Sequence, residues 1–566
     1  MDGSHVILLI IDSMIIDGQC RPTSTLTRMK MKELGLFAYV FVVLLLVIHC
    51  KGDSLNKGTV YLYNQTFTFK RGVIDENGIA YGIYNDTLNT TGWCRLHVRG
   101  GFSSQKYSDQ DIMYAAGFLE GALTSKHIRQ HSINMNSWAF SGKPDKFKDL
   151  LKDFFKKQDT WMRMQTESNK NDPFWQGIGL LIAQFDGLVA GYNSNPYQNK
   201  LDIFDFQILN GNGDLIDLGH VLMPERVPDW RKMSTQEFNQ FVATSGHCSA
   251  LVKVLPGFED VFMGHSSWFT YAATLRIYKH YDWQLQQKVA SQRISFSSYP
   301  GYLESLDDFY ILGSKMVMLQ TTNNIFNKEL YKHVKAESLL AWQRVRLANL
   351  LANNGSEWAN IIRRYNSGTY NNQYMVIDRK KISKTSIDDG ALWVVEQIPT
   401  LVESGDETAV LRAGYWPSYN VPFYEKIYNL SGYPEVVRER GPSYSYQLAP
   451  RAMIFRRDQS TVVDIESFKT ILRYNNYKND EYSDGNPCNS ICCRGDLMLN
   501  TSTNGCYDTK VTNMEMADRF VAYAISGPTK SHGLPPFKWT TNFNVSHVGL
   551  PEVYNFEFIE METIFD

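Results

Sequence analysis

The sequence has almost no excess of charge of either sign, because 57 lysines and arginines stand against 59 aspartates and glutamates for a net charge of −2. Proteins that bind nucleic acid usually carry a surplus of basic residues, so this balance argues against a nucleic-acid partner. Low-complexity tracts and internal repeats are also missing, and the hydrophobic share of 43% is enough to fill a sizeable core. The composition therefore predicts a folded protein whose partner is neutral or zwitterionic.

Several well-known catalytic and cofactor motifs are absent. No G-x-S-x-G nucleophile elbow, no H-E-x-x-H zinc motif and no Walker phosphate-binding loop occurs in the chain. The glycine-rich fragment at residues 210–214 lacks the final glycine of a dinucleotide fingerprint. We therefore expect neither a bound metal nor a cofactor.

Long hydrophobic runs are scarce, and the longest spans residues 34–48. The basic stretch 29–32 precedes it, and an apolar run of this length behind a basic end is typical of a secretory signal peptide. A membrane-spanning helix needs about twenty apolar residues, and a signal anchor is the alternative. We expect residues 1–50 to be an N-terminal extension that contains the signal peptide, with Met29 or Met31 as the translation start. No stable transmembrane span is expected after its cleavage.

Seven glycosylation sequons support entry into the secretory pathway. In each of them, an asparagine is followed two residues later by Ser or Thr with no intervening proline, at Asn64, Asn85, Asn89, Asn354, Asn429, Asn500 and Asn544. We therefore expect a glycoprotein that is secreted or delivered to the lysosomal lumen.

Cysteine is sparse, with 8 residues in the chain, and half of them cluster near the C-terminus. In an oxidising compartment we expect this cluster to form two disulfides among Cys488, Cys492, Cys493 and Cys506. Adjacent cysteines bridge each other only with strain, which leaves the pairs 488–493 with 492–506, or 488–492 with 493–506. A zinc knuckle is the alternative, but the cluster lacks C-x-x-C pairs and a nearby histidine.

An unpaired cysteine in an oxidising compartment suggests a reactive thiol, and Cys248 is the candidate. It precedes an apolar stretch at residues 249–255, and a Pro-Gly turn separates this predicted strand from a second one at residues 260–264. Antiparallel pairing about that turn places residue i opposite 513 − i, so Cys248 faces His265. A thiol beside an imidazole is typical of nucleophilic catalysis. The alternative is that Cys248 is a small buried hydrophobic residue.

The remaining pattern places helices and strands in blocks along the chain. Helices are expected from Ser108 onward, over residues 143–168, from Pro173 onward, from Trp268 to His280, within 326–364 and from Ile465 to Arg473. Strands are expected at 59–69, 92–99, 293–298, 308–313, 315–321, 373–378 and 391–398, with a hairpin at 202–217. Blocks of this kind predict an α+β fold rather than a series of β-α-β units.

Several longer motifs follow one another in order. They are residues 248–251 (CSAL), 264–268 (GHSSW), 296–301 (FSSYPG), 307–314 (DDFYILGS), 419–422 (YNVP) and 449–455 (APRAMIF). Together they resemble the phospholipase B-like family. The similarity covers residues 55–566 and leaves the N-terminal extension outside.

The resemblance implies an N-terminal nucleophile hydrolase, whose fold is an αββα sandwich of two stacked antiparallel sheets flanked by helices. It also implies a precursor that cuts itself between His247 and Cys248. Residues 51–247 would then form an N-terminal chain, and residues 248–566 a C-terminal chain of the same folded unit. The Cys248 thiol would be the nucleophile, and its freed α-amino group, with a pKa of about 8, would be the base.

The resemblance extends to residues around the nucleophile. By this resemblance, His265 orients or polarises the thiol, Asn420 donates to the oxyanion, and Arg451 holds a carboxylate or phosphate. Trp268 and Thr322 are expected to line the substrate pocket.

The implied activity is the removal of acyl chains from phospholipids by a carboxylic ester hydrolase. Its partner would be a phospholipid or another acylated small molecule. Two alternatives differ in class. The same machinery would act as an amidase on N-acyl amides or peptides, or the fold would persist as a non-catalytic lipid-binding glycoprotein.

Overall fold

The computed structural model describes residues 54–244, 248–541 and 543–565. The predicted signal peptide, both candidate start methionines and His247 lie outside these residues. Leu55–Asp566 forms one compact unit. Among the described helices, none is both long enough and apolar enough to cross a membrane.

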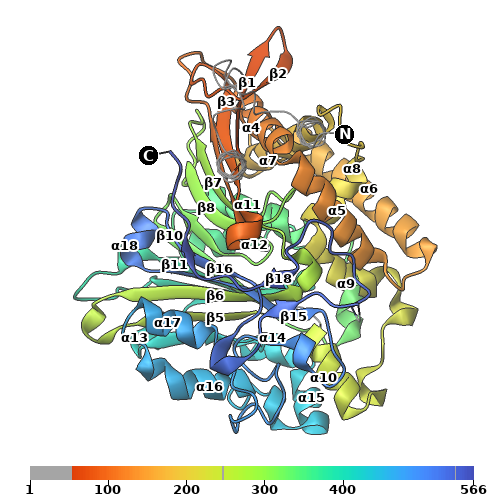
Figure 1. Cartoon of the computed structure of the whole chain (residues 1–566), viewed down its shortest axis with the longest axis vertical. Coiled ribbons are helices and arrows are strands. Elements are labelled where there is room, and N and C mark those ends of the chain that lie inside the picture. The colour runs from red at the N-terminus through yellow and green to blue at the C-terminus, as the bar shows by residue number, and fades with distance from the viewer. Residues whose placement is uncertain (1–53, 245–247, 542, 566) are drawn as a thin grey trace, which may run out of the picture. The chain divides into compact units, whose positions relative to one another are not determined.

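A large sheet forms one of two central layers (Figure 1). Its eleven strands are, in spatial order, β13 (Leu401–Asp406), β12 (Leu392–Ile398), β11 (Asn372–Asp378), β10 (Met316–Thr322), β9 (Tyr310–Leu312), β8 (Arg293–Ser298), β7 (Arg276–Trp283), β4 (Trp93–Gly100), β3 (Ala80–Asp86), β1 (Ser54–Tyr63) and β2 (Thr66–Arg71). β4 and β7 run parallel, whereas β3 with β4 and every pair from β7 to β13 are antiparallel.

A smaller sheet forms the second central layer. Its six strands are β14 (Tyr415–Ser418), β5 (Ser249–Val254), β6 (Val261–Thr270), β15 (Asn504–Thr512), β16 (Tyr523–Ser526) and β19 (Ile559–Glu560), all antiparallel to their neighbours. A separate two-stranded ribbon consists of β17 (Phe537–Lys538) and β18 (Val553–Tyr554).

Helices pack on the outer faces of both sheets. The large sheet is covered by α4 (Asp109–Leu123), α5 (Ser125–Phe140), α6 (Asp145–Ser168), α7 (Pro173–Asn193), α8 (Ile203–Asn210), α9 (Asn212–Leu222), α11 (Ala341–Leu351) and α12 (Gly355–Arg363). On the side of the small sheet lie α10 (Thr235–Thr244), α14 (Glu425–Leu430), α15 (Tyr433–Arg440), α16 (Pro450–Asp458) and α17 (Ile465–Leu472). Three short helices occupy connections, namely α3 (Leu88–Thr91), α13 (Thr408–Arg412) and α18 (Met514–Asp518).

Alternation along the strands explains how the two sheets stack. In β10, Val317 and Leu319 are buried between the sheets, whereas Met316 and Met318 belong to the core under the helices. Successive strand residues point to opposite faces, so a strand buried on both faces is apolar throughout. The result is an α+β sandwich of two stacked sheets between helix layers, which confirms the predicted fold class.

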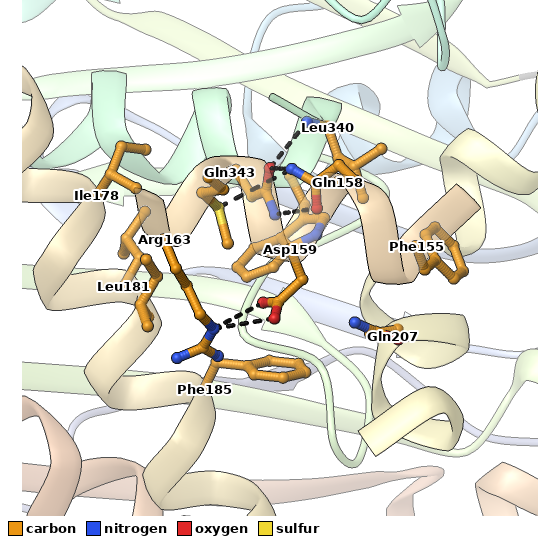
Figure 2. Close-up of a pocket in the computed structure, with 13 residues that line it drawn as sticks. Phe155, Gln158, Asp159, Arg163, Ile178, Leu181, Phe185, Gln207, Leu340 and Gln343 are labelled. Atoms are coloured by element: carbon orange, nitrogen blue, oxygen red, sulfur yellow. Dashed lines mark hydrogen bonds and ion pairs between the residues drawn. The ribbon is translucent and has the colours of Figure 1, made fainter. Parts of the chain in front are cut away.

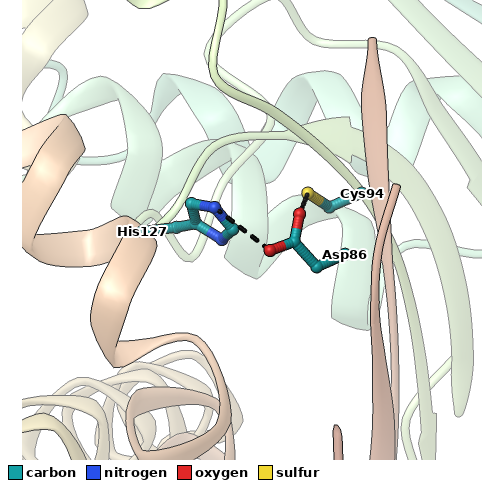
Figure 3. Close-up of side chains that lie close together, drawn as sticks. All are labelled: Asp86, Cys94 and His127. Carbon is teal, nitrogen blue, oxygen red and sulfur yellow. Dashed lines mark hydrogen bonds and ion pairs between the residues drawn. The ribbon is translucent and has the colours of Figure 1, made fainter. Parts of the chain in front are cut away.

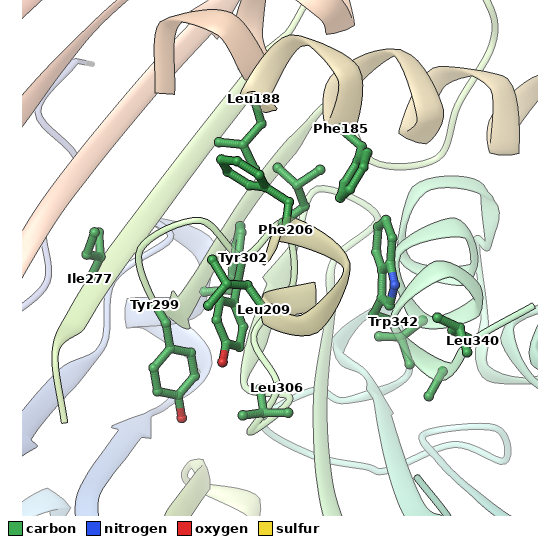
Figure 4. Packing of buried hydrophobic residues seen from close by; sticks show 14 of the residues in the cluster. Phe185, Leu188, Phe206, Leu209, Ile277, Tyr299, Tyr302, Leu306, Leu340 and Trp342 are labelled. Carbon is green, nitrogen blue, oxygen red and sulfur yellow. The ribbon is translucent and has the colours of Figure 1, made fainter. Parts of the chain in front are cut away.

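The core between the large sheet and its helices is rich in aromatic residues (Figure 4). Phe185 on α7 lies close to Trp342 on α11, with ring centroids 6.1 Å apart. Tyr299 and Tyr302, in the loop after β8, are also fully buried in this core. This loop leads directly to the residues beneath the candidate site.

Glycines allow the helices α4 and α7 to pack very closely. A Cβ added to Gly187 would lie 1.9 Å from the carbonyl oxygen of Tyr114, and one added to Gly191 would lie 1.9 Å from that of Phe118. No larger residue fits at either position without moving a backbone, so these glycines set the distance between the two helices.

Most predicted elements are present, but two were assigned the wrong type. Residues 202–217 form α8 and α9 instead of a hairpin, because the side chain of Asp202 accepts from the Asp205 amide in a capping box that starts a helix. The helix predicted after Trp268 is absent. There β6 continues to Thr270, and β7 begins at Arg276.

The C-terminal cysteine cluster forms two disulfides, Cys488–Cys493 and Cys492–Cys506. This outcome confirms the first of the two predicted pairings. Cys94 and Cys248 are free and buried.

Candidate active site

Cys248 immediately precedes β5, with only 5% of its surface exposed. It lines a cavity between the end of the small sheet, α9 and the loops that follow β8 and β10. The other residues of its lining are Gly213, Ile216, Ser267, Trp268, Phe269, Leu306, Asp307, Thr322, Tyr370 and Tyr507. The cavity therefore contains both predicted pocket residues, Trp268 and Thr322.

The predicted hairpin forms, but its register differs from the prediction. Ala250 pairs with His265 and Ser249 with Ser266, so paired residue numbers sum to 515 instead of 513. The turn is longer than a two-residue loop, since a 3₁₀ turn at Pro256–Phe258 follows Leu255. A shift of two residues keeps each side chain on its predicted face. Continuing the pairing by one residue places Cys248 opposite Ser267, and His265 lies two residues further along β6, opposite Ala250.

His265 is completely buried on the same face as Cys248. Its Nδ1 atom lies 3.3 Å from Ser267 Oγ and 3.2 Å from Lys510 Nζ. Burial, reinforced by the positive charge of Lys510, lowers the pKa of His265 well below its usual value. The imidazole is therefore neutral and supplies no positive charge to a thiolate.

The Cys248 thiol is protonated at neutral pH. Burial raises its pKa to about 12, although the backbone of Trp268 and the charge of Lys510 act in the opposite direction. A thiol is a weak nucleophile, so this side chain needs a nearby base before it attacks a carbonyl carbon.

Arg451 holds the backbone at Cys248. Its Nη1 atom donates to the carbonyl oxygen of Cys248 at 2.7 Å and to Ser249 Oγ at 3.1 Å. The Nη2 atom donates to the carbonyl oxygen of Tyr419 at 2.8 Å and to Asn420 Oδ1 at 2.6 Å. These four acceptors are neutral, and none of the ion pairs in the described part of the chain includes Arg451.

The guanidinium group of Arg451 also stacks on Trp268, with its carbon 4.4 Å from the ring centroid. Burial lowers the pKa of Arg451 to about 10, which leaves the group charged at neutral and acidic pH. A positive charge that has no acidic partner among the described residues favours an anionic ligand.

Asn420 connects Arg451 to Thr322. Its Nδ2 atom donates to the carbonyl oxygen of Thr322 at 2.6 Å, while its Oδ1 atom accepts from Arg451. Its φ angle is 69°, a left-handed conformation that asparagine adopts more readily than most residues. A carboxamide nitrogen has two N–H groups, so one remains for a further acceptor.

A second cavity adjoins the first at Trp268. Arg451, Asn420 and Trp268 contribute to its lining, together with Asn239 and Val242 of α10. The helix that precedes Cys248 in sequence therefore lies on the side of the site where the Arg451 guanidinium is located.

A buried ionic cluster, not predicted from the sequence, consists of Arg276, Asp307, Asp508 and Lys510. Lys510 Nζ lies 2.7 Å from Asp508 Oδ1 and forms a second ion pair with Asp307. Arg276 completes the cluster at 3.0 Å from Asp307 and 2.9 Å from Asp508. Asp307 accepts from Ser267 Oγ at 3.1 Å, so the cluster supports the wall of the cavity at Cys248. In the sequence, Asp307 opens one of the family motifs and Lys510 lies in a strand-like segment, but their spacing gives no sign that they meet.

Asp308, the neighbour of Asp307, is a buried carboxyl group that is 1% exposed. Neither of its oxygens has a hydrogen-bond partner among the described residues. Burial, followed by the charges of Asp307 and Asp214, raises the pKa of Asp308 well above its usual value. A carboxyl group whose pKa is raised on folding stabilises the folded state fully only below its unfolded pKa of about 3.9. This stability is lost as the pH rises towards the pKa of the folded state.

We therefore expect Asp308→Asn to stabilise the protein at pH 7 and to have little effect at pH 4. The gain should increase as the pH rises from 4 to 7, because the wild type progressively loses the stability contributed by the protonated Asp308 carboxyl. Asparagine also suits the φ angle of 47° at this position. Melting temperatures measured from pH 4 to pH 7.5 test this expectation.

Asp484→Asn is the matched control, because Asp484 has a φ angle of 46° but is exposed. Its melting temperature should follow that of the wild type at every pH. Equal shifts for Asp308→Asn at pH 4 and pH 7 would contradict the argument.

Another cavity lies among helices α6, α7, α8 and α11 (Figure 2). Gln158 Nε2 donates to Gln343 Oε1 at 2.9 Å on one side, and Arg163 binds Asp159 on the other. This cavity shares no lining residue with the two cavities beside Cys248. It contains no cysteine, and we do not include it in the candidate site.

Comparison with known proteins agrees with the similarity seen in the motifs. A family model described as phospholipase B matches residues 80–561. The chain is 53% identical over 500 residues to phospholipase B-like 1 of Homo sapiens, which covers 87% of this chain and 89% of that protein. It is 52% identical over 500 residues to phospholipase B-like 1 of Bos taurus, with coverage of 87% and 90%. It is 50% identical over 520 residues to phospholipase B of Crotalus adamanteus, with coverage of 90% and 93%. The chain therefore belongs to the phospholipase B family.

Proposed function

We propose that the protein is a carboxylic ester hydrolase that removes acyl chains from phospholipids, with Cys248 as its nucleophile. The observation that carries this proposal is the position of the Arg451 guanidinium, 2.7 Å from the carbonyl oxygen of Cys248 and without an acidic partner in the described structure. A phospholipid offers an ester carbonyl and, a few atoms away, a phosphate that this charge attracts. The relatives in Crotalus adamanteus, Bos taurus and Homo sapiens are named phospholipase B or phospholipase B-like 1, which supports a phospholipid substrate.

The nucleophile would be generated by self-cleavage between His247 and Cys248. The Cys248 sulfur attacks the carbonyl carbon of His247, the C–N bond breaks, and a thioester joins His247 to Cys248 while the α-amino group is released. Water then hydrolyses the thioester, which leaves a carboxylate on His247 and a free thiol on Cys248. The chains produced would be residues 51–247 and 248–566.

The released α-amino group would supply the base that the uncut chain lacks. Its ordinary pKa is about 8, so its neutral form is available to take the thiol proton. The thiolate attacks the ester carbonyl and expels the alcohol, which receives that proton. Water then attacks the acyl thioester and releases the fatty acid, with the amine again as the base.

The neighbouring residues would have distinct roles in these steps. The second N–H of the Asn420 carboxamide would donate to the oxyanion of the tetrahedral intermediate. The neutral imidazole of His265, beside Ser267, would orient the cavity wall next to the thiol. Arg451 would hold the phosphate, and Trp268 and Thr322 would shape the pocket for the acyl ester.

The asparagines of the seven predicted glycosylation sites differ in how exposed their side chains are. Asn64, Asn89, Asn429, Asn500 and Asn544 are exposed. Asn354 instead caps α12, since its Oδ1 atom accepts from the Glu357 amide at 2.9 Å. The Oδ1 atom of Asn85 is buried. We propose the five exposed positions as the principal glycan acceptors.

The substrate is tested by giving the purified, cleaved protein phosphatidylcholine and, separately, an N-acyl amide with the same acyl chain. We expect fatty acid release from the phospholipid, measured by mass spectrometry. Turnover of the amide alone would favour the amidase alternative. A cleaved protein that turns over neither compound and retains lipid through purification would favour the lipid-binding alternative.

The phosphate contact is tested with diacylglycerol, which presents the same esters without a phosphate. The wild type should prefer phosphatidylcholine, and Arg451→Gln should lower its kcat/KM for that substrate by tenfold or more, as expected for a lost hydrogen bond to a charged group worth about 1.5–3 kcal/mol. The activity on diacylglycerol should fall much less. Equal losses on both substrates would show that Arg451 acts only by holding the backbone of Cys248.

A further inference from the structure

Three residues with metal-binding side chains meet far from Cys248 in the sequence and share no residue with the cavities around it (Figure 3). Asp86 ends β3, and Cys94 lies in β4, where the pairing of Asn85 with Arg95 brings the two side by side. His127 lies in the first turn of α5 and points towards them. Two strands of the large sheet and one covering helix therefore supply the three side chains.

The three side chains lie close together, with the Asp86 carboxylate between the other two. Cys94 Sγ lies 3.6 Å from Asp86 Oδ1, and His127 Nε2 lies 3.5 Å from Asp86 Oδ2. All three ligand atoms lie within 4.8 Å of one another. Zinc bonds of about 2.0–2.3 Å at tetrahedral angles separate neighbouring ligand atoms by about 3.3–3.6 Å. The two contacts to Asp86 already have about this length but involve its two different oxygens, so the carboxylate must rotate and the side chains must draw together for one ion to bind all three.

The imidazole of His127 is already held in the orientation that a metal ligand requires. Its Nδ1 atom forms a short hydrogen bond with the hydroxyl of Tyr84, which is buried. The Nε2 atom is thereby directed towards Asp86. A histidine that binds a metal through one nitrogen commonly has its other nitrogen fixed in this way by a neighbouring polar group.

Solvent reaches the group through Asp86. The side chain of Asp86 is 19% exposed, whereas Cys94 is fully buried. Lys126 Nζ lies 3.8 Å from Asp86 Oδ2, but its side chain is 68% exposed and is free to turn into water when a cation binds. A water molecule would complete the coordination from this side.

The donor set selects the type of metal. Sulfur, imidazole nitrogen and carboxylate oxygen together suit Zn²⁺, whereas Ca²⁺ and Mg²⁺ require oxygen ligands. We propose that Asp86, Cys94 and His127 form a zinc site that ties β3 and β4 to α5. This site differs from the sequence-based expectation of no metal, because the three residues are too far apart in sequence to show a ligand spacing.

Zinc binding is tested on the full-length secreted protein after metal removal by a chelator. We expect isothermal titration with Zn²⁺ at neutral pH to give one site per chain. Titration with Co²⁺ should produce a near-ultraviolet band from thiolate coordination. That band should be lost in Cys94→Ser and retained in Cys248→Ser, which removes the other free buried thiol. A band that persists in Cys94→Ser, or its complete absence in the wild type, would overturn the proposal.

Two further variants keep the test valid if Cys94→Ser folds poorly. Tyr84→Phe preserves the three ligands and should weaken Zn²⁺ binding by about 10–100-fold, because the imidazole loses its fixed partner. Lys126→Ala should bind at least as tightly as the wild type, since a nearby positive charge is removed. Saturating Zn²⁺ should raise the melting temperature of the wild type and of Lys126→Ala. Unchanged Zn²⁺ affinity in Tyr84→Phe, together with no thermal shift in the wild type, would exclude this site.

Discussion

Cys248→Ala is expected to yield a single uncut chain without measurable phospholipid hydrolysis. Under the proposed mechanism, one sulfur atom both breaks the 247–248 bond and later carries the acyl group, so its removal abolishes both reactions. Loss of a nucleophile typically lowers kcat by about 10⁴-fold or more. The substitution leaves only a small gap at a side chain that is already buried, and the fold should persist. Intact mass and N-terminal sequencing of the deglycosylated protein provide the measurement.

Cys248→Ser separates the chemistry from the fold. A hydroxyl occupies nearly the same space as the thiol but is a poorer nucleophile, so slow and incomplete cleavage is expected. A melting temperature close to that of the wild type would show that either variant is folded. Cleavage of Cys248→Ala at the same bond would mean that another protease makes the cut and that Cys248 is the small buried residue of the alternative interpretation.

The hydrolytic activity of the wild type should depend on pH differently before and after cleavage. In the uncut chain, burial raises the thiol pKa to about 12. The imidazole of His265 stays neutral near pH 7 because its own pKa is lowered, so it does not stabilise a thiolate. Activity that appears only after cleavage and rises through the pKa of the new α-amino group, about 8 before perturbation, is the pattern that this assignment requires.

Local sequence patterns predicted which strands carry the site, but they did not predict the register in which these strands pair. The apolar stretch before a Pro-Gly turn correctly predicted the β5–β6 hairpin and the face on which Cys248 lies. The register depended on a longer turn, in which a 3₁₀ turn at Pro256–Phe258 with Gly257 at a φ angle of 69° follows Leu255. In the same way, residues 202–217 contain turn-forming glycines and asparagines, but the cap at Asp202 and burial under α6 favour helices. Turn length decided the first case, and helix capping together with burial decided the second.

The proximity of residues that are distant in sequence could be recognised only from the family resemblance or from the structure. Nothing in the spacing of Cys248, Asn420 and Arg451 indicates that they meet, yet hydrogen bonds connect them directly. Lys510 is a stronger example, because a lysine in a strand is ordinarily exposed. Its burial depends on two aspartates, one of them more than 200 residues away in the chain.

We expect Lys510→Met to be the most destabilising single substitution near the site. Lys510 is completely buried and neutralises Asp508 at 2.7 Å, and it also pairs with Asp307. Together with Arg276 it balances two negative charges with two positive ones. Methionine preserves the apolar volume but leaves one uncompensated buried charge, and such a loss typically costs about 3–5 kcal/mol. The melting temperature should fall sharply, with the hydrolytic activity reduced in any protein that remains folded.

The reduction in activity has a separate physical origin. Lys510 lowers the pKa of Cys248, and it also holds Ser267 and His265 at the cavity. Its removal should therefore raise the thiol pKa further and reduce the small fraction of reactive thiolate. The rate of thiol alkylation at several pH values, measured below the melting temperature, reports this change independently of substrate binding.

A charge-balanced double variant distinguishes electrostatic loss from poor packing. Lys510→Met combined with Asp508→Asn removes one charge of each sign and retains the pair of Arg276 and Asp307 at 3.0 Å. Two substitutions that share a network are not additive, so the double variant should be more stable than Lys510→Met alone. Lys157→Met provides the surface control, because its pair with Asp153 is exposed and should contribute no more than about 0.5 kcal/mol. If the double variant is less stable than Lys510→Met, the cluster stabilises the fold through its individual hydrogen bonds and not through charge balance. Recovery of stability without recovery of thiol reactivity would show that Lys510 acts on Cys248 through its own charge.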